Sequence, residues 1–339
     1  MVTLWYPARC PTHGRARAPW LPPEAAALYK QKVSQQLHTS LDTVDLPLTH
    51  AYTNAAVEEY GHGLPVVLFS PGYRAQRALG AALVEDLASR GHAVVTIDHT
   101  HESDIVEFPG GRLEPGRQPG RPTDEDIAKA LRVRQDDTRF VLDELAGLNA
   151  GRNPDAEGRP LPHGLCGALG LRRTGMFGHS LGGDTAAEVM AADHRVMAGA
   201  DLDGSINGSV AATGLDRPFL LMRNASHGRE NDPSWEEFWS HLRGWRRSLR
   251  LRASGPDLHG PVPADATAGH GGPAPARGGR RHDRCHRHDH RGPRRSRRAG
   301  LSGRLLRPSP VVPGPGQASP VRSVPALPRD RVRALTDRR

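Results

Sequence analysis

The segment from Gly178 to Gly182, Gly-His-Ser-Leu-Gly, constrains the fold of this chain more than any other feature. It matches the pattern Gly-x-Ser-x-Gly and lies between a strand predicted at about residues 172–178 and a helix predicted at about residues 181–192. Glycines at these two positions let a strand turn sharply into a helix, so that the serine projects above the sheet. A helix that begins directly behind the serine also favours negative charge there. The segment therefore predicts a strand-turn-helix unit with Ser180 as a nucleophile.

Strand-like and helix-like segments alternate along the rest of the chain. Short apolar runs that are typical of buried strands occupy residues 64–70 and 92–98. Further strands are predicted at about residues 172–178, 196–202, 218–223 and 248–252. Helix-like segments occupy residues 24–37, 75–90, 123–148, 181–192 and 233–243. Such alternation is typical of a mainly parallel central sheet with helices on both faces. Together with the serine turn, it predicts the α/β-hydrolase fold.

Two of these helices carry end signals. In the first, Leu79, Leu83 and Leu87 are spaced by four residues and predict one apolar face, and Gly91 predicts its end. In the second, Thr123 is followed by three acidic residues, a pattern that predicts an N-cap at Thr123.

Composition changes abruptly after Gly255. Residues 1–255 hold 28 Lys and Arg against 31 Asp and Glu, whereas residues 256–339 hold 18 against 6 and contain no Phe, Tyr, Trp, Ile, Met, Asn, Lys or Glu. A segment with so few large apolar side chains cannot bury enough surface to fold. We predict a hydrolase domain at residues 1–255, incomplete at its C-terminal end, and a disordered Arg/Pro/Gly-rich tail at residues 256–339.

The basic charge of the chain belongs to this tail, so no nucleic-acid partner is expected for the domain. A run of about 18 apolar residues, which a membrane span requires, does not occur. The N-terminal residues do not read as an export signal, although full-length relatives are expected to be secreted. No feature of the sequence indicates an oligomeric state.

An acyl-transfer serine needs two backbone N–H groups that hold the oxyanion of its intermediate. One comes from the residue after the nucleophile, which is Leu181. The other comes from a loop behind a core strand, and the loop Ser-Pro-Gly-Tyr-Arg at residues 70–74 follows such a strand. We predict the Tyr73 N–H as the second donor; the alternative is an ordinary Pro-Gly turn.

The acid of a Ser-His-Asp triad follows the serine in this fold, at the tip of a later strand. Asp201 and Asp203 both lie near the end of the strand at residues 196–202. We predict Asp203, because Gly204 behind it allows the chain to turn, whereas Asp201 lies deeper in the strand.

The triad histidine should follow the last strand, and none stands directly behind residues 248–252. His259 is the nearest, and His227 precedes the last helix and is interpreted as a polar loop residue. Residues 255–261 can be encoded so that two added nucleotides in codon 256 give Gly-His-Arg-Ile-Phe-Thr-Asp. We therefore predict a frame error in the DNA near codon 256 that removes the histidine.

No cofactor or metal site is expected. The three cysteines show no CxxC spacing, and the His-rich stretch at residues 282–290 lies in the predicted tail, where no scaffold would hold a metal.

Several motifs resemble the isoform II platelet-activating factor acetylhydrolase family and its bacterial lipase-like members. They are found at residues 2–8 (Val-Thr-Leu-Trp-Tyr-Pro-Ala), 68–73, 98–100, 106–109, 178–183 and 202–204. The resemblance implies a calcium-independent serine hydrolase of lipid or other carboxylic esters, including phospholipids with short sn-2 acyl chains, with Ser180 as nucleophile and Asp203 as acid. The alternative hypothesis is a non-catalytic binding protein on a hydrolase scaffold, or a basic-tailed nucleic-acid binder.

Overall fold

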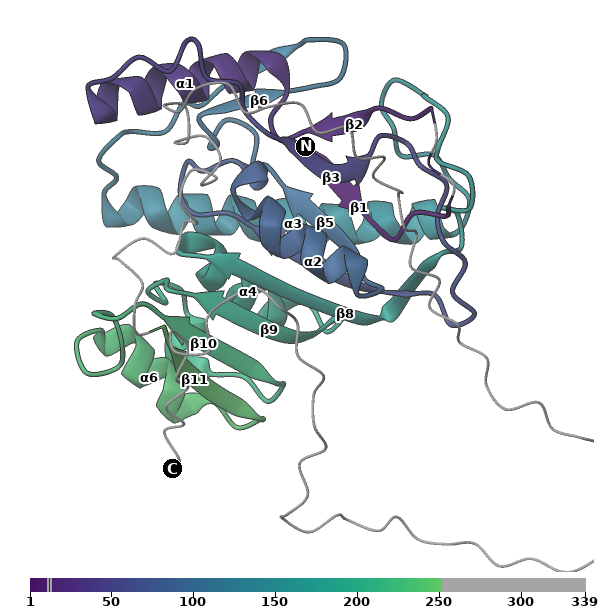
Figure 1. Ribbon diagram of the computed structural model, residues 1–339. Coiled ribbons are helices and arrows are strands. Elements are labelled where there is room, and N and C mark those ends of the chain that lie inside the picture. The colour runs from purple at the N-terminus through teal and green to yellow at the C-terminus, as the bar shows by residue number, and fades with distance from the viewer. Residues whose placement is uncertain (11, 13, 252–339) are drawn as a thin grey trace, which may run out of the picture. The chain divides into compact units, whose positions relative to one another are not determined.

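The computed structural model describes residues 1–10, 12 and 14–251. Their centre is a seven-stranded sheet with the order β1-β5-β4-β8-β9-β10-β11 (Figure 1). The strands are β1 (Val2–Trp5), β4 (Leu64–Ser70), β5 (Ala93–Ile97), β8 (Leu169–His179), β9 (Val196–Leu202), β10 (Phe219–Arg223) and β11 (Arg246–Arg250). Only β1, which pairs with β5, runs antiparallel to its neighbour among these strands of the described chain.

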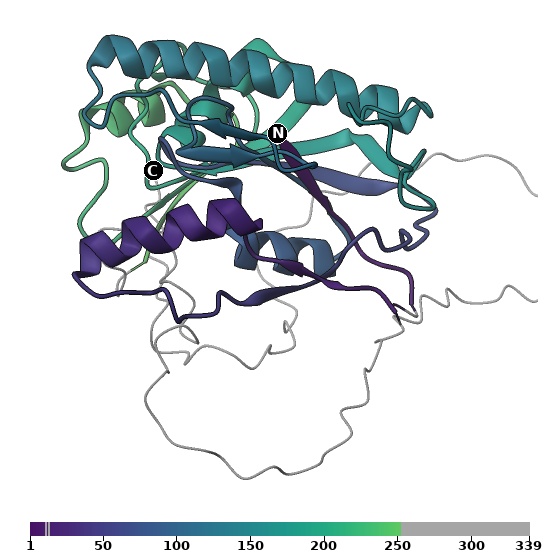
Figure 2. The same ribbon diagram turned by 90° about the horizontal axis from the view of Figure 1, so that it is seen from above.

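Helices cover both faces of this sheet. Figure 2 shows the long helix α3 (Asp124–Asn149) along one side, and α1 (Pro23–Leu37) and α2 (Ala81–Ser89) along the other. Helix α4 (Leu181–Ala192) packs between α3 and the strands β8 and β9, and α6 (Pro233–His241) follows β10 in the chain. The predicted fold class, a mainly parallel sheet with helices on both faces, is confirmed.

The main core lies around the central strands. All five residues of β5 are buried, and β4 alternates buried and half-buried residues before three buried ones. Phe219, Trp235 and Phe238 extend this core toward α6, and the rings of Phe219 and Phe238 meet edge to face at 5.1 Å. Such burial of large apolar side chains stabilises the layer between helices and sheet.

The prediction for residues 75–90 is wrong in detail. These residues form a 3₁₀ turn, η1 (Arg77–Gly80), followed by the shorter helix α2. Because a 3₁₀ turn has three residues per turn, it shifts the phase of the helix behind it. Leu83 is consequently 53% exposed, and Ala81, Val84 and Ala88 form the buried face instead. Gly91, with φ of 92°, does follow the end of this helix.

The predicted N-cap of α3 is confirmed. Thr123 and Asp126 form a capping box, in which the Thr123 side chain accepts the Asp126 N–H and the Asp126 carboxylate accepts the Thr123 N–H. Such a box satisfies two donors that a helix otherwise leaves unpaired.

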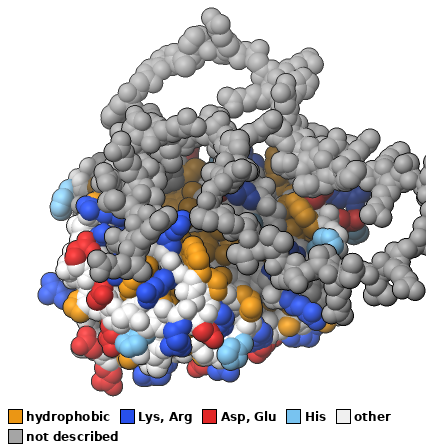
Figure 3. All heavy atoms as spheres, turned by 90° about the horizontal axis from the view of Figure 1, so that it is seen from below, with side chains coloured by type: hydrophobic (Ala, Val, Ile, Leu, Met, Phe, Trp, Pro, Cys, Tyr) orange, Lys and Arg blue, Asp and Glu red, His pale blue; other side chains and the backbone are white. Residues whose placement is uncertain are grey.

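The structure also contains short elements that were not predicted. They are the antiparallel pairs β2 (Arg17–Pro19) with β3 (Leu48–Tyr52) and β6 (Ile105–Glu107) with β7 (Leu113–Pro115), and the single turn α5 (Val210–Thr213). Four of them, β2, β6, β7 and α5, have only three or four residues, which is too few to show a hydrophobic period in the sequence. On the face drawn in Figure 3, basic and acidic side chains are interspersed with hydrophobic ones, in keeping with the small net charge of this part of the chain.

The predicted tail at residues 256–339 lies outside the described residues, as do His259 and the His-rich stretch. The boundary after residue 255 therefore stays a prediction.

Candidate active site

Ser180 lies in the sharp turn between β8 and α4. Its backbone has φ 53° and ψ −127°, an unusual conformation for a residue with a side chain. The Ser180 N–H donates to Leu202 O at 3.0 Å, and the Gly183 N–H donates to Ser180 O at 2.8 Å. These bonds join the turn to the end of β9 and to the first turn of α4. The residue is half-buried.

The glycines around Ser180 are required by close packing. A Cβ on Gly178 would lie 2.1 Å from the Gly182 carbonyl carbon, and a Cβ on Gly182 would lie 2.0 Å from Ser70 O. Because no side chain fits at these distances, the start of α4 rests directly on the end of β4. The serine turn and the loop behind β4 are thus in contact.

The loop behind β4 lies beside Ser180. A Cβ on Gly72 would lie 3.5 Å from the Ser180 Cβ. The Tyr73 side chain packs with Leu181 in a small apolar cluster on α3. Within the described residues, neither the Tyr73 N–H nor the Leu181 N–H donates a hydrogen bond. Tyr73 and Leu181, whose N–H groups are predicted to hold an oxyanion, therefore lie side by side.

Asp203 follows β9, at the same end of the parallel strands as Ser180. A Cβ on Gly204 would lie 2.2 Å from Ser180 O, so the two turns touch. Asp203 has a φ of 65°, and Asn224 donates to it through its N–H at 2.9 Å and its side-chain amide at 2.7 Å. Burial alone would raise the pKa of Asp203, but hydrogen bonds from His227 and Asn224 outweigh it and hold this pKa below its usual value. Asp203 is therefore an ionised carboxylate that is held in place.

His227 was interpreted from the sequence as a polar loop residue, and the structure gives it a closer connection to the site. Its Nδ1 lies 2.9 Å from Asp203 Oδ1, and its Nε2 lies 2.8 Å from Asp232 Oδ2. Its ring packs on Trp235, whose indole N–H donates to Gly204 O. The hydrogen bond to Asp203, reinforced by Asp232, raises the pKa of His227.

Of the predicted site residues, His227 is hydrogen-bonded to Asp203. Among the described residues, no hydrogen bond joins the Ser180 hydroxyl to a histidine ring. No local pattern marks His227 as a partner of Asp203, since the two residues are 24 positions apart in the chain and meet only because β9 and β10 are neighbours.

Asp201, the other acid weighed from the sequence, is fully buried below the site. Its carboxylate accepts the Gly204 N–H at 3.0 Å. Burial, together with the nearby carboxylate of Asp184, raises the pKa of Asp201 well above its usual value. Asp201 holds the backbone of Gly204, whereas Asp203 is hydrogen-bonded to His227. Asp203 is therefore the better candidate for the triad acid.

Among the residues that the structure describes, no group of three His, Cys, Asp or Glu side chains is arranged to hold a metal ion. No helix in that part of the chain is both long and apolar enough to cross a bilayer.

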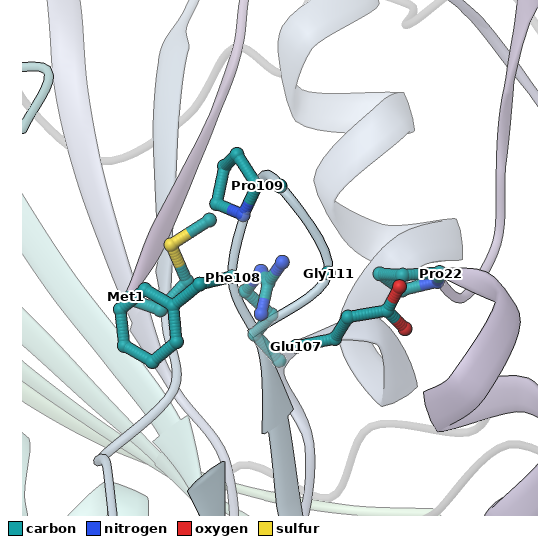
Figure 4. A pocket seen from close by; sticks show the side chains of 8 residues that line it. Met1, Pro22, Glu107, Phe108, Pro109 and Gly111 are labelled. Atoms are coloured by element: carbon teal, nitrogen blue, oxygen red, sulfur yellow. The ribbon is translucent and has the colours of Figure 1, made fainter. Parts of the chain in front are cut away.

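A cavity of about 210 Å³ lies away from the predicted site residues, between Met1, Pro22 and the turn at residues 107–111 (Figure 4). Glu107 in its wall accepts the N–H groups of Glu24 and Ala25, the first turn of α1. An acidic side chain at a helix N-terminus stabilises that helix. The contacts of Glu107 are therefore accounted for by the helix.

Comparisons with known proteins find relatives that are named as esterases. The chain is 32% identical over 218 residues, 61% of its length and 51% of the other protein, to the "Probable 1-alkyl-2-acetylglycerophosphocholine esterase" of Arthroderma benhamiae. It is 26% identical over 161 residues, 42% of its length and 35% of the other, to the platelet-activating factor acetylhydrolase of Cavia porcellus. The chain thus matches about half or less of these two relatives.

Among solved structures, a ferulic acid esterase from Streptomyces cinnamoneus is similar, with a TM-score of 0.57 and 37% identity over 76% of this chain and 67% of that one. The model of the family "Platelet-activating factor acetylhydrolase, isoform II" matches residues 1–208, which include Ser180 and Asp203. The chain therefore belongs to the isoform II platelet-activating factor acetylhydrolase family.

Proposed function

We propose that this chain hydrolyses carboxylic esters through an acyl-enzyme formed on Ser180. The observation that carries the proposal is the strained turn at Ser180, packed between the Gly72–Tyr73 loop and the Gly204 turn. Strained backbone conformations of this kind cluster at active sites. Family membership and relatives named as esterases support the same reaction class.

In the proposed reaction, the Ser180 oxygen attacks the ester carbonyl carbon while a histidine takes the serine proton. The N–H groups of Tyr73 and Leu181 hold the oxyanion that forms. As the intermediate collapses, the bond to the alcohol oxygen breaks and the histidine returns the proton to that oxygen. A water molecule then repeats these steps on the acyl-enzyme, which releases the acid and restores Ser180.

Asp203 orients the histidine and stabilises its protonated form in this scheme. Two histidines of the chain can fill this role. His227 already contacts Asp203, but its second nitrogen must leave Asp232 before it can accept a proton from Ser180. His259 is the candidate from chain order and lies outside the described residues.

The names of the relatives suggest possible substrates. One is named for an acetylated glycerophosphocholine, one for platelet-activating factor and one for ferulic acid. We propose esters of lipids, among them phospholipids with a short sn-2 acyl chain, as the preferred class. No cofactor enters the proposed reaction.

The test is hydrolysis by the full chain of three esters: p-nitrophenyl acetate, a phosphatidylcholine with an sn-2 acetyl group, and methyl ferulate. With His227 or His259 as the base, we expect turnover that disappears in Ser180→Ala and is highest on the acetylated lipid. The variants His227→Gln and His259→Gln then show which histidine is the base, because only loss of the base lowers turnover by orders of magnitude.

Turnover of all three esters that is the same in Ser180→Ala as in the wild type would disprove the proposal. Absence of turnover, combined with retained binding of an ester analogue, would instead favour a binding protein on a hydrolase scaffold.

A further inference from the structure

Arg134 is a buried arginine of α3 that no part of the proposed reaction uses. Its side chain is 1% exposed, and its guanidinium donates to backbone and side-chain acceptors. Nη1 lies 3.0 Å from Ser70 Oγ and 2.7 Å from Pro71 O, and Nη2 lies 3.0 Å from Gly72 O. Nε donates to Glu102 at 2.7 Å, and Nη2 donates to the other oxygen of this carboxylate. All these neutral acceptors belong to residues 70–72, at the start of the predicted oxyanion loop.

These contacts fix the direction of a peptide group. In a trans peptide the C=O and the following N–H point in opposite directions. The Gly72 carbonyl is held by Arg134 and also by the Ala75 N–H at 3.0 Å. The Tyr73 N–H, which belongs to the same peptide, is therefore directed away from Arg134. Gly72 itself lies against Ser180, as its virtual Cβ distance of 3.5 Å shows.

Two further chains of contacts hold the loop at its ends. Glu102, paired with Arg134, accepts the Arg74 N–H at 3.1 Å, and Arg74 has a positive φ of 61°. At the other end, Ser70 Oγ lies 3.0 Å from His99 Nε2, and His99 Nδ1 lies 2.8 Å from an Asp137 oxygen. Both Ser70 and His99 are buried.

The pKa shifts of His99 and Glu102, which both lie beside Arg134, favour a single ionisation state of these three residues. Burial and the positive charge of Arg134 lower the pKa of His99, which favours a neutral ring. Burial opposes ionisation of Glu102, but its contacts with Arg134 outweigh this effect and keep the pKa of Glu102 below its usual value. The cluster thus contains one ion pair, Arg134 with Glu102, and a neutral histidine.

Stability alone is a weak explanation for such an arrangement. A buried ion pair loses so much hydration that well-packed apolar residues in its place are often as stable or more stable. A planar guanidinium with five donors can, however, hold several acceptors in one fixed geometry, as it does here for three successive residues.

We propose that Arg134 is a positioning residue for catalysis. It orients the peptide between Gly72 and Tyr73 so that the Tyr73 N–H faces the oxyanion of the intermediate formed on Ser180. This inference rests on the proposed function, because it assigns a role within the Ser180 reaction. Arg134 acts through the loop and does not touch the reacting atoms. Glu102 holds the guanidinium and the Arg74 end of the loop.

The test uses Arg134→Met in the full chain, with p-nitrophenyl acetate as substrate. Since loss of an oxyanion donor costs about 10²–10³ in kcat and misplacement by about 1 Å about 10², we expect a drop in kcat of about 10- to 100-fold with KM changed by less than about 3-fold. If Arg134 were merely structural, its replacement would lower the amount of folded enzyme, and the loss of activity would follow the decrease in Tm.

Arg217→Met is the matched control. Arg217 likewise donates to backbone carbonyls, those of Asp193, Val196 and Met190. It precedes the N-terminal end of β10, whereas Ser180 follows the C-terminal end of the parallel strand β8. We expect it to lower the Tm without lowering the kcat of the folded enzyme by more than about 2-fold.

Amide hydrogen exchange of residues 72–74 gives a second readout that does not need turnover. We expect faster exchange in Arg134→Met than in the wild type and in Arg217→Met. If Arg134→Met does not fold, Arg134→Lys replaces it, because a lysine keeps a charge for Glu102 but cannot hold both carbonyls as a planar fork does.

The outcomes separate the two proposals. If the wild type hydrolyses no ester, the proposed function fails and the exchange experiment alone decides whether Arg134 holds the loop. Wild-type kcat in a folded Arg134 variant, or unchanged exchange at residues 72–74, would overturn the inference.

Discussion

The bridge that His227 forms between Asp203 and Asp232 leads to a quantitative prediction. His227→Ala removes two hydrogen bonds of 2.9 and 2.8 Å between an imidazolium and carboxylates. Hydrogen bonds to charged groups contribute about 1.5–3 kcal/mol each. Both carboxylates keep other donors, Asn224 for Asp203 and Ser205 and Ser234 for Asp232, so the lower end applies. We expect a loss of about 3 kcal/mol in the free energy of unfolding.

The loss should depend on pH with a definite sign. Because the pKa of His227 is raised in the folded protein, its stabilising contribution is complete below the unfolded pKa, about 6.5, and is lost as pH rises through the folded pKa. The pKa values of Asp203 and Asp232 are lowered, so their contributions are present above about 3.9 and are lost as pH falls through the folded values. The difference between wild type and variant is therefore greatest between about pH 4.5 and 6.5.

Thermal unfolding followed by circular dichroism measures this difference. At about 2–4 °C per kcal/mol for a domain of this size, His227→Ala should lower the Tm by about 6–12 °C at pH 6 and by less at pH 9. His241→Ala is the control, because the His241 ring contacts the backbone carbonyls of Ala211 and Glu237. A Tm within about 1 °C of wild type at pH 6, or a difference that grows toward pH 9, would refute the reasoning.

Three further predictions concern the core, the turn and the gene. Burial raises the pKa of Asp184 to about 7, so stability should fall as pH rises from about 4 to 8, and Asp184→Asn should flatten this dependence in thermal melts. Gly182→Ala, whose Cβ would lie 2.0 Å from Ser70 O, should unfold the domain or lower its stability by more than about 3 kcal/mol, whereas Gly61→Ala, with open space around it, should change it by less than about 1 kcal/mol in urea titrations. Resequencing the gene should reveal a frame error near codon 256, with a histidine codon within a few positions of Gly255 in another frame; if neither other frame has one, this prediction is wrong.

The sequence predicts those features that depend on neighbours in the chain. The strand-turn-helix unit at Ser180, the buried strands and the N-cap at Thr123 all follow from local patterns. Leu83 shows where a local pattern fails, because the 3₁₀ turn before α2 changes which residues face the sheet.

Contacts between distant segments could not be predicted in this way. In the sequence, Arg134 has the pattern of an exposed charge on a long helix, and only the packing of α3 over the end of β4 buries it. His227 reaches Asp203 because two strands are neighbours in the sheet. The assignment of Ser180, Asp203, Tyr73 and Leu181 to catalysis remains a prediction.

Covalent labelling of Ser180 tests the central claim most directly. The native full chain is treated with a fluorophosphonate probe, and the labelled peptide is identified by mass spectrometry. A nucleophilic serine in this turn predicts one phosphonyl group per chain, on Ser180, which is lost after heat denaturation and absent in Ser180→Ala. Labelling that persists unchanged in Ser180→Ala would contradict the account.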